Sequence, residues 1–194
     1  MTVYLIRHAQ SVFNAIYDPD KPDPMIFDAP LSELGVQQAA RAQAKIHQLA
    51  ITRLIVSPLT RTLQTATLIF GKSLATEINA VVREQLINSC DMGRAPQKLA
   101  IEFPHHDFNH LPECWWHDEE KDHRGLSVES HGSLLQRADE FARYLQQNNH
   151  NHHKTAIVSH GNFIHALTGV QPDNCDILRF DPVTRQAELV NLDP

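Results

Sequence analysis

Residues 3–9 read VYLIRHA, a short apolar run that ends directly in an arginine and a histidine. Residues 155–161, TAIVSHG, have the same form. Short apolar runs of this kind are typical of buried strands in α/β proteins. Ligands of open α/β sheets collect at the carboxyl ends of the strands. We therefore expect His8 and His160 to lie together in one crevice.

Elsewhere the chain alternates short apolar runs with longer amphipathic ones, which predicts an α/β sheet with helices on its faces. The predicted strands are Val3–Ile6, Leu54–Val56, Ile78–Val82 and Thr155–Val158, and Ile177–Phe180 and Ala187–Leu192 form a hairpin around Asp181 and Pro182.

Four helices are predicted from apolar residues at helical spacing and from capping residues. The first starts at Ser32 as N-cap and the fourth near Asn162. The second has Ser57 as N-cap and Pro58 at its first position. The third carries an apolar stripe of Leu134, Ala138, Phe141, Ala142 and Leu145.

Two stretches break this rhythm. Asp18–Pro30 contains four prolines and is predicted to be a loop. The segment 90–128 is long and rich in histidine, tryptophan and acidic residues, as functional lids are. Trp115 and Trp116 within it either cover the substrate or pack the interior, and the sequence leaves both open.

Composition narrows the class of protein. A net charge of -6 over 194 residues argues against a nucleic-acid partner, which selects for a basic face. The three cysteines form no CxxC pair, which favours a reducing environment. No apolar stretch has the length of a membrane span. We therefore expect a cytoplasmic protein with no membrane partner.

A third segment, SPLTRT at 57–62, places Arg61 near the start of a helix that follows a strand. Helix N-termini and guanidinium groups both favour phosphate. Basic groups gathered on an otherwise acidic chain thus predict an anion site at the strand ends.

Four stretches in a fixed order carry a family signature: RHA at 7–9, PLSELGVQQA at 30–39, SPLTRTLQTA at 57–66 and SHG at 159–161. Together they resemble the motifs of the histidine phosphatase superfamily, also called phosphoglycerate-mutase-like. This resemblance implies a three-layer αβα sandwich with a central, mostly parallel sheet, one domain over 1–194, and an inserted lid over about 90–128. It also implies that no cofactor or metal is required.

The resemblance further implies residue roles. His8 is the nucleophile, and Arg7, Asn14, Arg61 and His160 bind the phosphoryl oxygens. Such clamping suits phosphoryl transfer, whose transition state spreads negative charge over the equatorial oxygens. Nearby guanidinium groups also keep the histidine neutral by lowering its pKa.

A general acid must protonate the leaving oxygen. Glu84, just beyond the predicted third strand, occupies the position of the family's proton donor. Asp91 is a second candidate for the same role.

Several positions depart from the commonest family pattern. Ala9 replaces the usual glycine, Gln10-Ser11 replaces Glu-Thr, and CDMGR at 90–94 resembles a branch found among fungal and plant members.

The resemblance is compatible with three functions: a phosphomonoesterase acting on a small phosphorylated metabolite, a phosphoglycerate mutase, or a catalytically weak module that binds phosphorylated ligands. The substrate and a possible homodimer are left open.

Histidine clusters raise a metal hypothesis. The run 150–153 lies among asparagines in a predicted loop, and the other cluster comprises His105, His106, His110, His117 and His123. Neither has the spacing of a tight ligand set, so we predict no metal site.

Overall fold

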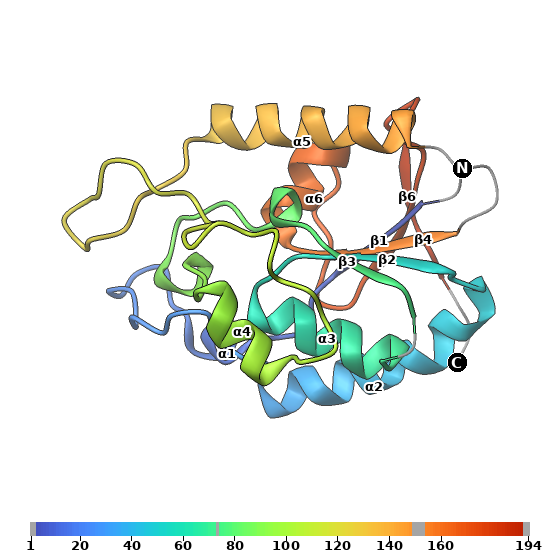
Figure 1. Cartoon of the computed structure of the whole chain (residues 1–194), viewed down its shortest axis with the longest axis horizontal. Helices are drawn as coiled ribbons and strands as arrows, with labels where there is room; N and C mark the ends of the chain where they lie inside the picture. The colour runs from blue at the N-terminus through green and yellow to red at the C-terminus, as the bar shows by residue number, and fades with distance from the viewer. Residues whose placement is uncertain (1–2, 73, 149–153, 192–194) are drawn as a thin grey trace.

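The computed structural model describes residues 3–72, 74–148 and 154–191 and contains a six-stranded sheet (Figure 1). The strand order is β3-β2-β4-β1-β5-β6. The strands are β1 (Val3–Arg7), β2 (Arg53–Val56), β3 (Thr76–Ile78), β4 (Thr155–Ser159), β5 (Ile177–Phe180) and β6 (Ala187–Leu189).

The sheet is mostly parallel. β1 to β4 run parallel to one another, whereas β5 pairs with β1 and β6 in antiparallel register. The predicted C-terminal hairpin is confirmed as β5–β6, although β6 ends at Leu189 and Leu192 lies outside the described residues.

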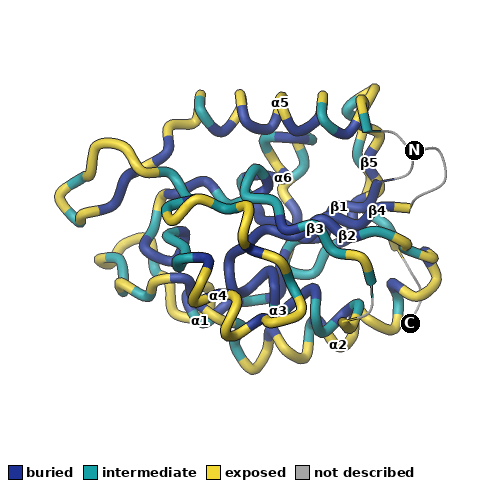
Figure 2. Tube along the Cα trace, viewed as in Figure 1, coloured by how far each residue is buried: buried dark blue, intermediate teal, exposed yellow. Residues whose placement is uncertain are grey.

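Helices cover both faces of the sheet, which makes three layers (Figure 1). Alternate side chains of β1 enter two separate cores: Tyr4 and Ile6 pack towards α2 and α3, and Val3 and Leu5 towards α5 and α6. Figure 2 shows the buried sheet between the two helical layers. The predicted αβα sandwich is therefore confirmed. The helices are α1 (Val12–Ile16), α2 (Glu33–Ile46), α3 (Thr60–Phe70), α4 (Pro96–Glu102), α5 (His131–Gln147) and α6 (Gly161–Thr168).

Ser32 caps α2 as predicted, since its side chain accepts a hydrogen bond from Gly35 N. The predicted start of α3 is wrong by two residues. Leu59 is the N-cap and the helix begins at Thr60. The reason lies far away in sequence: the Asp28 carboxylate accepts a hydrogen bond from Thr60 N at 2.7 Å. Asp28 thus caps the N-terminus of α3, the role that the sequence analysis predicted for Ser57.

The third strand is also shorter than predicted. β3 ends at Ile78, and Ala80–Val82 form the 3-10 helix η2. The Asn79 side chain accepts a hydrogen bond from Val81 N at 2.9 Å, which turns the chain out of the sheet. Glu84 therefore follows a turn instead of a strand.

The segment 90–128 contains α4 and otherwise irregular chain after the 3-10 helix η3 (Ser89–Asp91). Leu99, Phe103, Phe108 and Trp115 pack into the core beside α2 and α3. Trp115 also donates a hydrogen bond from Nε1 to Arg94 O at 2.9 Å. For Trp115 the packing alternative holds. The role of the segment as a lid remains a prediction.

Two further expectations concern the histidine run and membrane-spanning helices. The histidine run 150–153 lies outside the described residues. Within the described residues, no helix combines the length and the apolar character needed to cross a bilayer.

Candidate active site

Three polar side chains follow the carboxyl ends of neighbouring parallel strands. β1 and β4 pair so that Arg7 lies opposite Ser159, and β2 and β4 pair so that Val56 lies opposite Val158. The next residues along these strands are His8, His160 and Ser57. The sheet register therefore brings them to one edge. His8 and His160 meet edge to face with ring centroids 5.1 Å apart, as the sequence predicted.

His8 is held in one tautomer by its two neighbours. Its Nδ1 lies 2.7 Å from Ala9 O, which can only accept a hydrogen bond. Its Nε2 accepts a hydrogen bond from Arg61 Nε at 3.2 Å. The proton must then reside on Nδ1, which leaves the lone pair on Nε2. Nε2 is thus the nitrogen of a neutral imidazole that carries the free lone pair.

Burial and positive charge both keep the two rings neutral. His8 is 3% exposed and His160 is fully buried. Desolvation, followed by the charge of Arg61, lowers the pKa of each ring well below its ordinary value. Each histidine is therefore neutral around pH 7.

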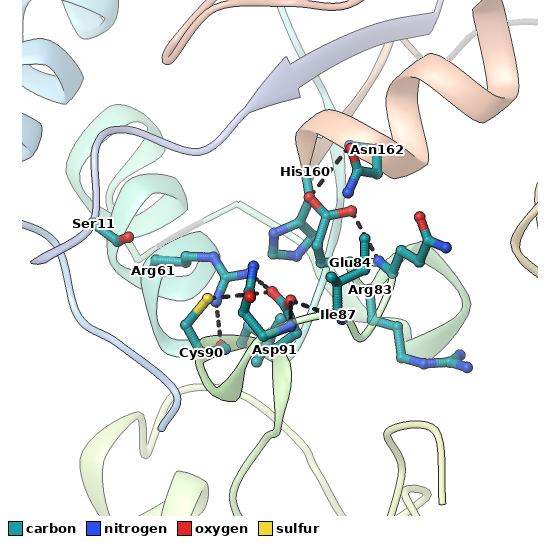
Figure 3. Close-up of polar contacts among 12 residues, drawn as sticks. Ser11, Arg61, Arg83, Glu84, Ile87, Cys90, Asp91, His160 and Asn162 are labelled. Atoms are coloured by element: carbon teal, nitrogen blue, oxygen red, sulfur yellow. Dashed lines mark hydrogen bonds and ion pairs between the residues drawn. The ribbon is translucent and has the colours of Figure 1, made fainter. Parts of the chain in front are cut away.

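Arg61 is positioned by three different groups. Besides its bond to His8, it donates from Nη1 to Cys90 O at 2.7 Å and from Nη2 to Asp91 Oδ1 at 2.9 Å. Figure 3 shows the Arg61 guanidinium group next to Cys90 and Asp91. The side chains of Arg61 and Asp91 are 2% and 6% exposed, so this is a buried ion pair. These contacts hold the Arg61 guanidinium group beside His8 Nε2.

His160 is oriented by Ser57, whose Oγ lies 2.8 Å from His160 Nε2. The other ring nitrogen, Nδ1, is buried and has no hydrogen-bond partner among the described residues. A buried polar atom without a partner costs about 1–3 kcal/mol. An anion that accepted a bond from Nδ1 would remove this cost.

Arg7 presents a second unpartnered donor. Its Nη1 donates to Pro172 O at 2.8 Å, whereas its buried Nε has no partner in the described chain. The guanidinium group passes close to Gly161, where an added Cβ would lie 3.4 Å from Arg7 Nε and 2.8 Å from Gln171 Nε2. A side chain at position 161 would therefore press on the Gln171 amide and only touch Arg7.

Glu84 lies at the N-terminus of α6 (Figure 3). Its carboxyl group accepts hydrogen bonds from Asn162 N at 3.3 Å and Phe163 N at 3.2 Å. Desolvation and the neighbouring charge of Asp91 nevertheless raise the pKa of Glu84 to about 7. A carboxyl group of this kind can both donate and accept a proton near neutral pH.

The two carboxyl groups proposed from sequence as proton donors differ in their bonding. Asp91 uses Oδ1 for Arg61 and Oδ2 for the backbone N–H groups of Ile87 and Asn88, at 3.2 and 3.1 Å. Every one of these partners is a donor, so both carboxyl oxygens of Asp91 are engaged as acceptors.

Asn14 is exposed and caps α1. Its Oδ1 accepts a hydrogen bond from Ser11 N at 3.1 Å, and its backbone N–H donates to Ser11 Oγ. No hydrogen bond within the described chain joins Asn14 to the His8 cluster. The structure therefore brings together His8, Arg7, Arg61, His160 and Glu84, and gives Asn14 a capping contact of its own.

The motif at 57–66 proves to be a set of specific contacts. Ser57 meets His160, Thr60 meets Asp28, and Arg61 meets His8. Gln64 Oε1 accepts from Leu31 N at 2.8 Å, and Thr65 Oγ1 accepts from Ala9 N at 3.1 Å. The sequence showed the motif but not these partners, because all of them lie far from the motif along the chain.

In the described ranges, no group of three or more histidine, cysteine, aspartate or glutamate side chains is arranged to hold a metal ion. The arginines are the positive groups beside His8. Metal independence stays a prediction for an activity assay to test.

Comparison with protein-family models gives a match over residues 3–183 to the model described as "Histidine phosphatase superfamily (branch 1)". Among curated proteins, the chain is similar to "Phosphoglycerate mutase-like protein 1" of Arabidopsis thaliana, with 34% identity over 101 residues. That match covers 48% of this chain and 36% of the relative. The matched stretch thus spans about a third of the length of that relative.

Two solved structures show the same fold over nearly the whole chain. One is the ecdysone phosphate phosphatase of Bombix mori in complex with tungstate, with a TM-score of 0.66, 16% identity, and coverage of 100% of this chain and 93% of that one. The other is a mycobacterial glucosyl-3-phosphoglycerate phosphatase in complex with VO3, with a TM-score of 0.64, 19% identity and coverage of 97% and 96%.

Proposed function

Because this chain belongs to the histidine phosphatase superfamily, we propose that it hydrolyses a small phosphate monoester through a phosphohistidine formed on His8. The observation that carries the proposal is the tautomer of His8. Its Nε2 lone pair lies at the edge of the sheet, beside the Arg61 guanidinium group.

In the first step, the Nε2 lone pair of His8 forms a bond to phosphorus, and the bond from phosphorus to the ester oxygen breaks. The hydrogen bond from Arg61 Nε to His8 Nε2 must break first. Arg61 Nε then donates to a phosphoryl oxygen instead. The Nδ1 proton remains on the ring. Ala9 O stabilises the positive charge that the phosphorylated imidazole then carries.

The phosphoryl oxygens are bound by Arg7 Nε and His160 Nδ1, two buried nitrogens beside His8 that have no partner within the described chain, together with Arg61. If Nδ1 of His160 donates to the anion, its Nε2 must accept, so the Ser57 hydroxyl donates to it. Asn14 belongs to the proposed set only if its exposed amide turns towards the bound anion. Preorganised donors of this kind stabilise the charge that develops in the transition state.

Glu84 supplies the proton to the leaving oxygen. It then acts as the base in the second step, when it removes a proton from water. The water oxygen attacks phosphorus, the bond to His8 Nε2 breaks, and inorganic phosphate leaves. A pKa of about 7 suits both roles, since the group exchanges a proton in each half of the cycle. Asp91 instead holds Arg61.

The pH profile of kcat/KM follows from these assignments. Glu84 must be protonated in the free enzyme, so kcat/KM for an alkyl phosphate is expected to fall as pH rises above about 7. His8 must be neutral, and its lowered pKa places any loss from its protonation well below the ordinary range of histidine. The measurement is kcat/KM from pH 4 to 9 for the wild type and Glu84→Gln. An alkaline limb that persists in Glu84→Gln would contradict the assignment.

The activity itself is tested with p-nitrophenyl phosphate in the presence of excess chelator. We expect full turnover, because the arginines supply the positive charge that a metal otherwise provides. Loss of activity on chelation, restored by one divalent metal, would contradict the metal-free mechanism.

A second substrate tests the mutase alternative, which is suggested by the similarity to the Arabidopsis phosphoglycerate mutase-like protein. A mutase returns the phosphoryl group to a sugar acid, whereas a phosphatase gives it to water. Incubation with 3-phosphoglycerate should therefore release inorganic phosphate or leave the compound unchanged. Formation of 2-phosphoglycerate would identify a mutase.

A further inference from the structure

The segment that carries Glu84 receives its support from a side chain on another element. Residues 83 and 84 follow η2 and belong to neither a helix nor a strand. The guanidinium group of Arg137, on α5, donates to three backbone carbonyls of this segment. Nη1 donates to Val81 O at 2.7 Å and to Arg83 O at 2.8 Å, and Nη2 donates to Glu84 O at 3.4 Å.

Arg137 is itself held by a buried carboxylate. Its Nε donates to Glu129 Oε1 at 3.0 Å, and its Nη2 to Glu129 Oε2 at 2.6 Å, in a two-point contact. Arg137 is 7% exposed and Glu129 is 1% exposed. Planar two-point pairing of this kind fixes the direction of a guanidinium group as well as its location.

Glu129 also binds the segment directly. Its backbone N–H donates to Leu86 O at 2.9 Å, and its backbone oxygen accepts from Gln85 Nε2 at 2.9 Å. Arg83 Nη2 lies 3.3 Å from Glu129 Oε1. The chain on both sides of Glu84 is therefore tied to the Glu129–Arg137 pair.

The Glu129–Arg137 pair also contacts α6, the helix whose first N–H groups donate to the Glu84 carboxyl group. Arg137 stacks its guanidinium group over the ring of Phe163, 5.2 Å from the centroid. Phe163 N is one of the donors to the Glu84 carboxyl group. The pair thus orients both the backbone of the acid and the helix start that the acid contacts.

A buried ion pair stabilises a fold little more than apolar side chains of the same volume would, because both charges lose their hydration. Such a pair does fix one conformation of the groups around it. We propose that Glu129 and Arg137 are positioning residues for Glu84, which set the acid against the leaving oxygen. This inference rests on the proposed role of Glu84 as proton donor.

The test compares benzyl phosphate, an alkyl ester that depends on the acid, with p-nitrophenyl phosphate, which needs it much less. Arg137→Lys keeps the charge but cannot span three carbonyls and a carboxylate. We expect kcat for benzyl phosphate to fall about 10- to 100-fold, and kcat for p-nitrophenyl phosphate to fall less than about 3-fold. The matched control is Arg53→Lys, which alters the Arg53–Glu77 pair at the opposite end of β2 and should change neither rate.

A double variant separates positioning from general destabilisation. In a Glu84→Gln background, Arg137→Lys should cause no further selective loss on benzyl phosphate, because the group it positions is gone. Equal losses on both substrates, or a selective loss that persists without Glu84, would overturn the proposal.

Folding is followed by circular dichroism and thermal unfolding. If Arg137→Lys does not fold, the double variant Glu129→Leu/Arg137→Met removes both charges together and leaves neither unpaired. Full benzyl phosphate turnover in that folded variant would overturn the proposal. A selective loss in Glu84→Gln without one in the Arg137 variants overturns this inference alone. No selective loss in Glu84→Gln overturns the acid assignment and this inference with it.

Discussion

Replacing His8 with alanine is expected to abolish phosphatase turnover while leaving the fold intact. The substitution removes Nε2, the atom that forms the covalent intermediate, and no other described group occupies its place beside Arg61. His8 also lies beyond the end of β1, so removal of its ring leaves the packing of the sheet unchanged. The measurements are kcat for p-nitrophenyl phosphate and the thermal unfolding midpoint of both proteins.

The matched control is His165→Ala. His165 lies on α6, close in sequence to His160, but its side chain is exposed. This variant should keep wild-type kcat. Substantial turnover by a folded His8→Ala enzyme would remove His8 from the mechanism.

Glu84→Gln is expected to slow benzyl phosphate hydrolysis by roughly 10²–10⁴-fold, the usual contribution of general acid catalysis. An alkoxide is a poor leaving group and needs the proton, whereas nitrophenolate leaves largely without it. The same variant should therefore slow p-nitrophenyl phosphate much less. Glutamine keeps the size of the side chain but cannot transfer the proton.

Asp91→Asn provides the comparison for this second prediction. Because Asp91 anchors Arg61 through a buried ion pair, its loss should impair both substrates to a similar extent. If instead Asp91→Asn shows the leaving-group dependence and Glu84→Gln does not, the proton donor is Asp91.

Much of the fold is predictable because its signals are local. The apolar runs of β1 and β4 and the capping serine of α2 lie in continuous sequence, and each produced the expected element. The errors have non-local or side-chain causes. Asp28 caps α3 from 32 residues away in the chain, and the Asn79 side chain ends β3 early.

The site divides in the same way. His8, Arg61 and His160 could be predicted to converge because parallel strands place their carboxyl ends at one edge. The partners that orient them could not, since Asp91 and Ser57 act across the fold. One signal for the Glu129–Arg137 pair was present in the sequence. Arg137 falls within the apolar stripe of α5, and a charge on a buried face requires a partner.

The central claim is that His8 Nε2 carries the phosphoryl group during turnover. The most direct measurement is to trap the enzyme with a labelled phosphate ester, denature it in alkali, and locate the label by peptide mass spectrometry. We expect a base-stable, acid-labile adduct on His8 that is absent from His8→Ala. Turnover with the label on any other residue, or with no covalent label under conditions that trap an intermediate, would contradict the claim.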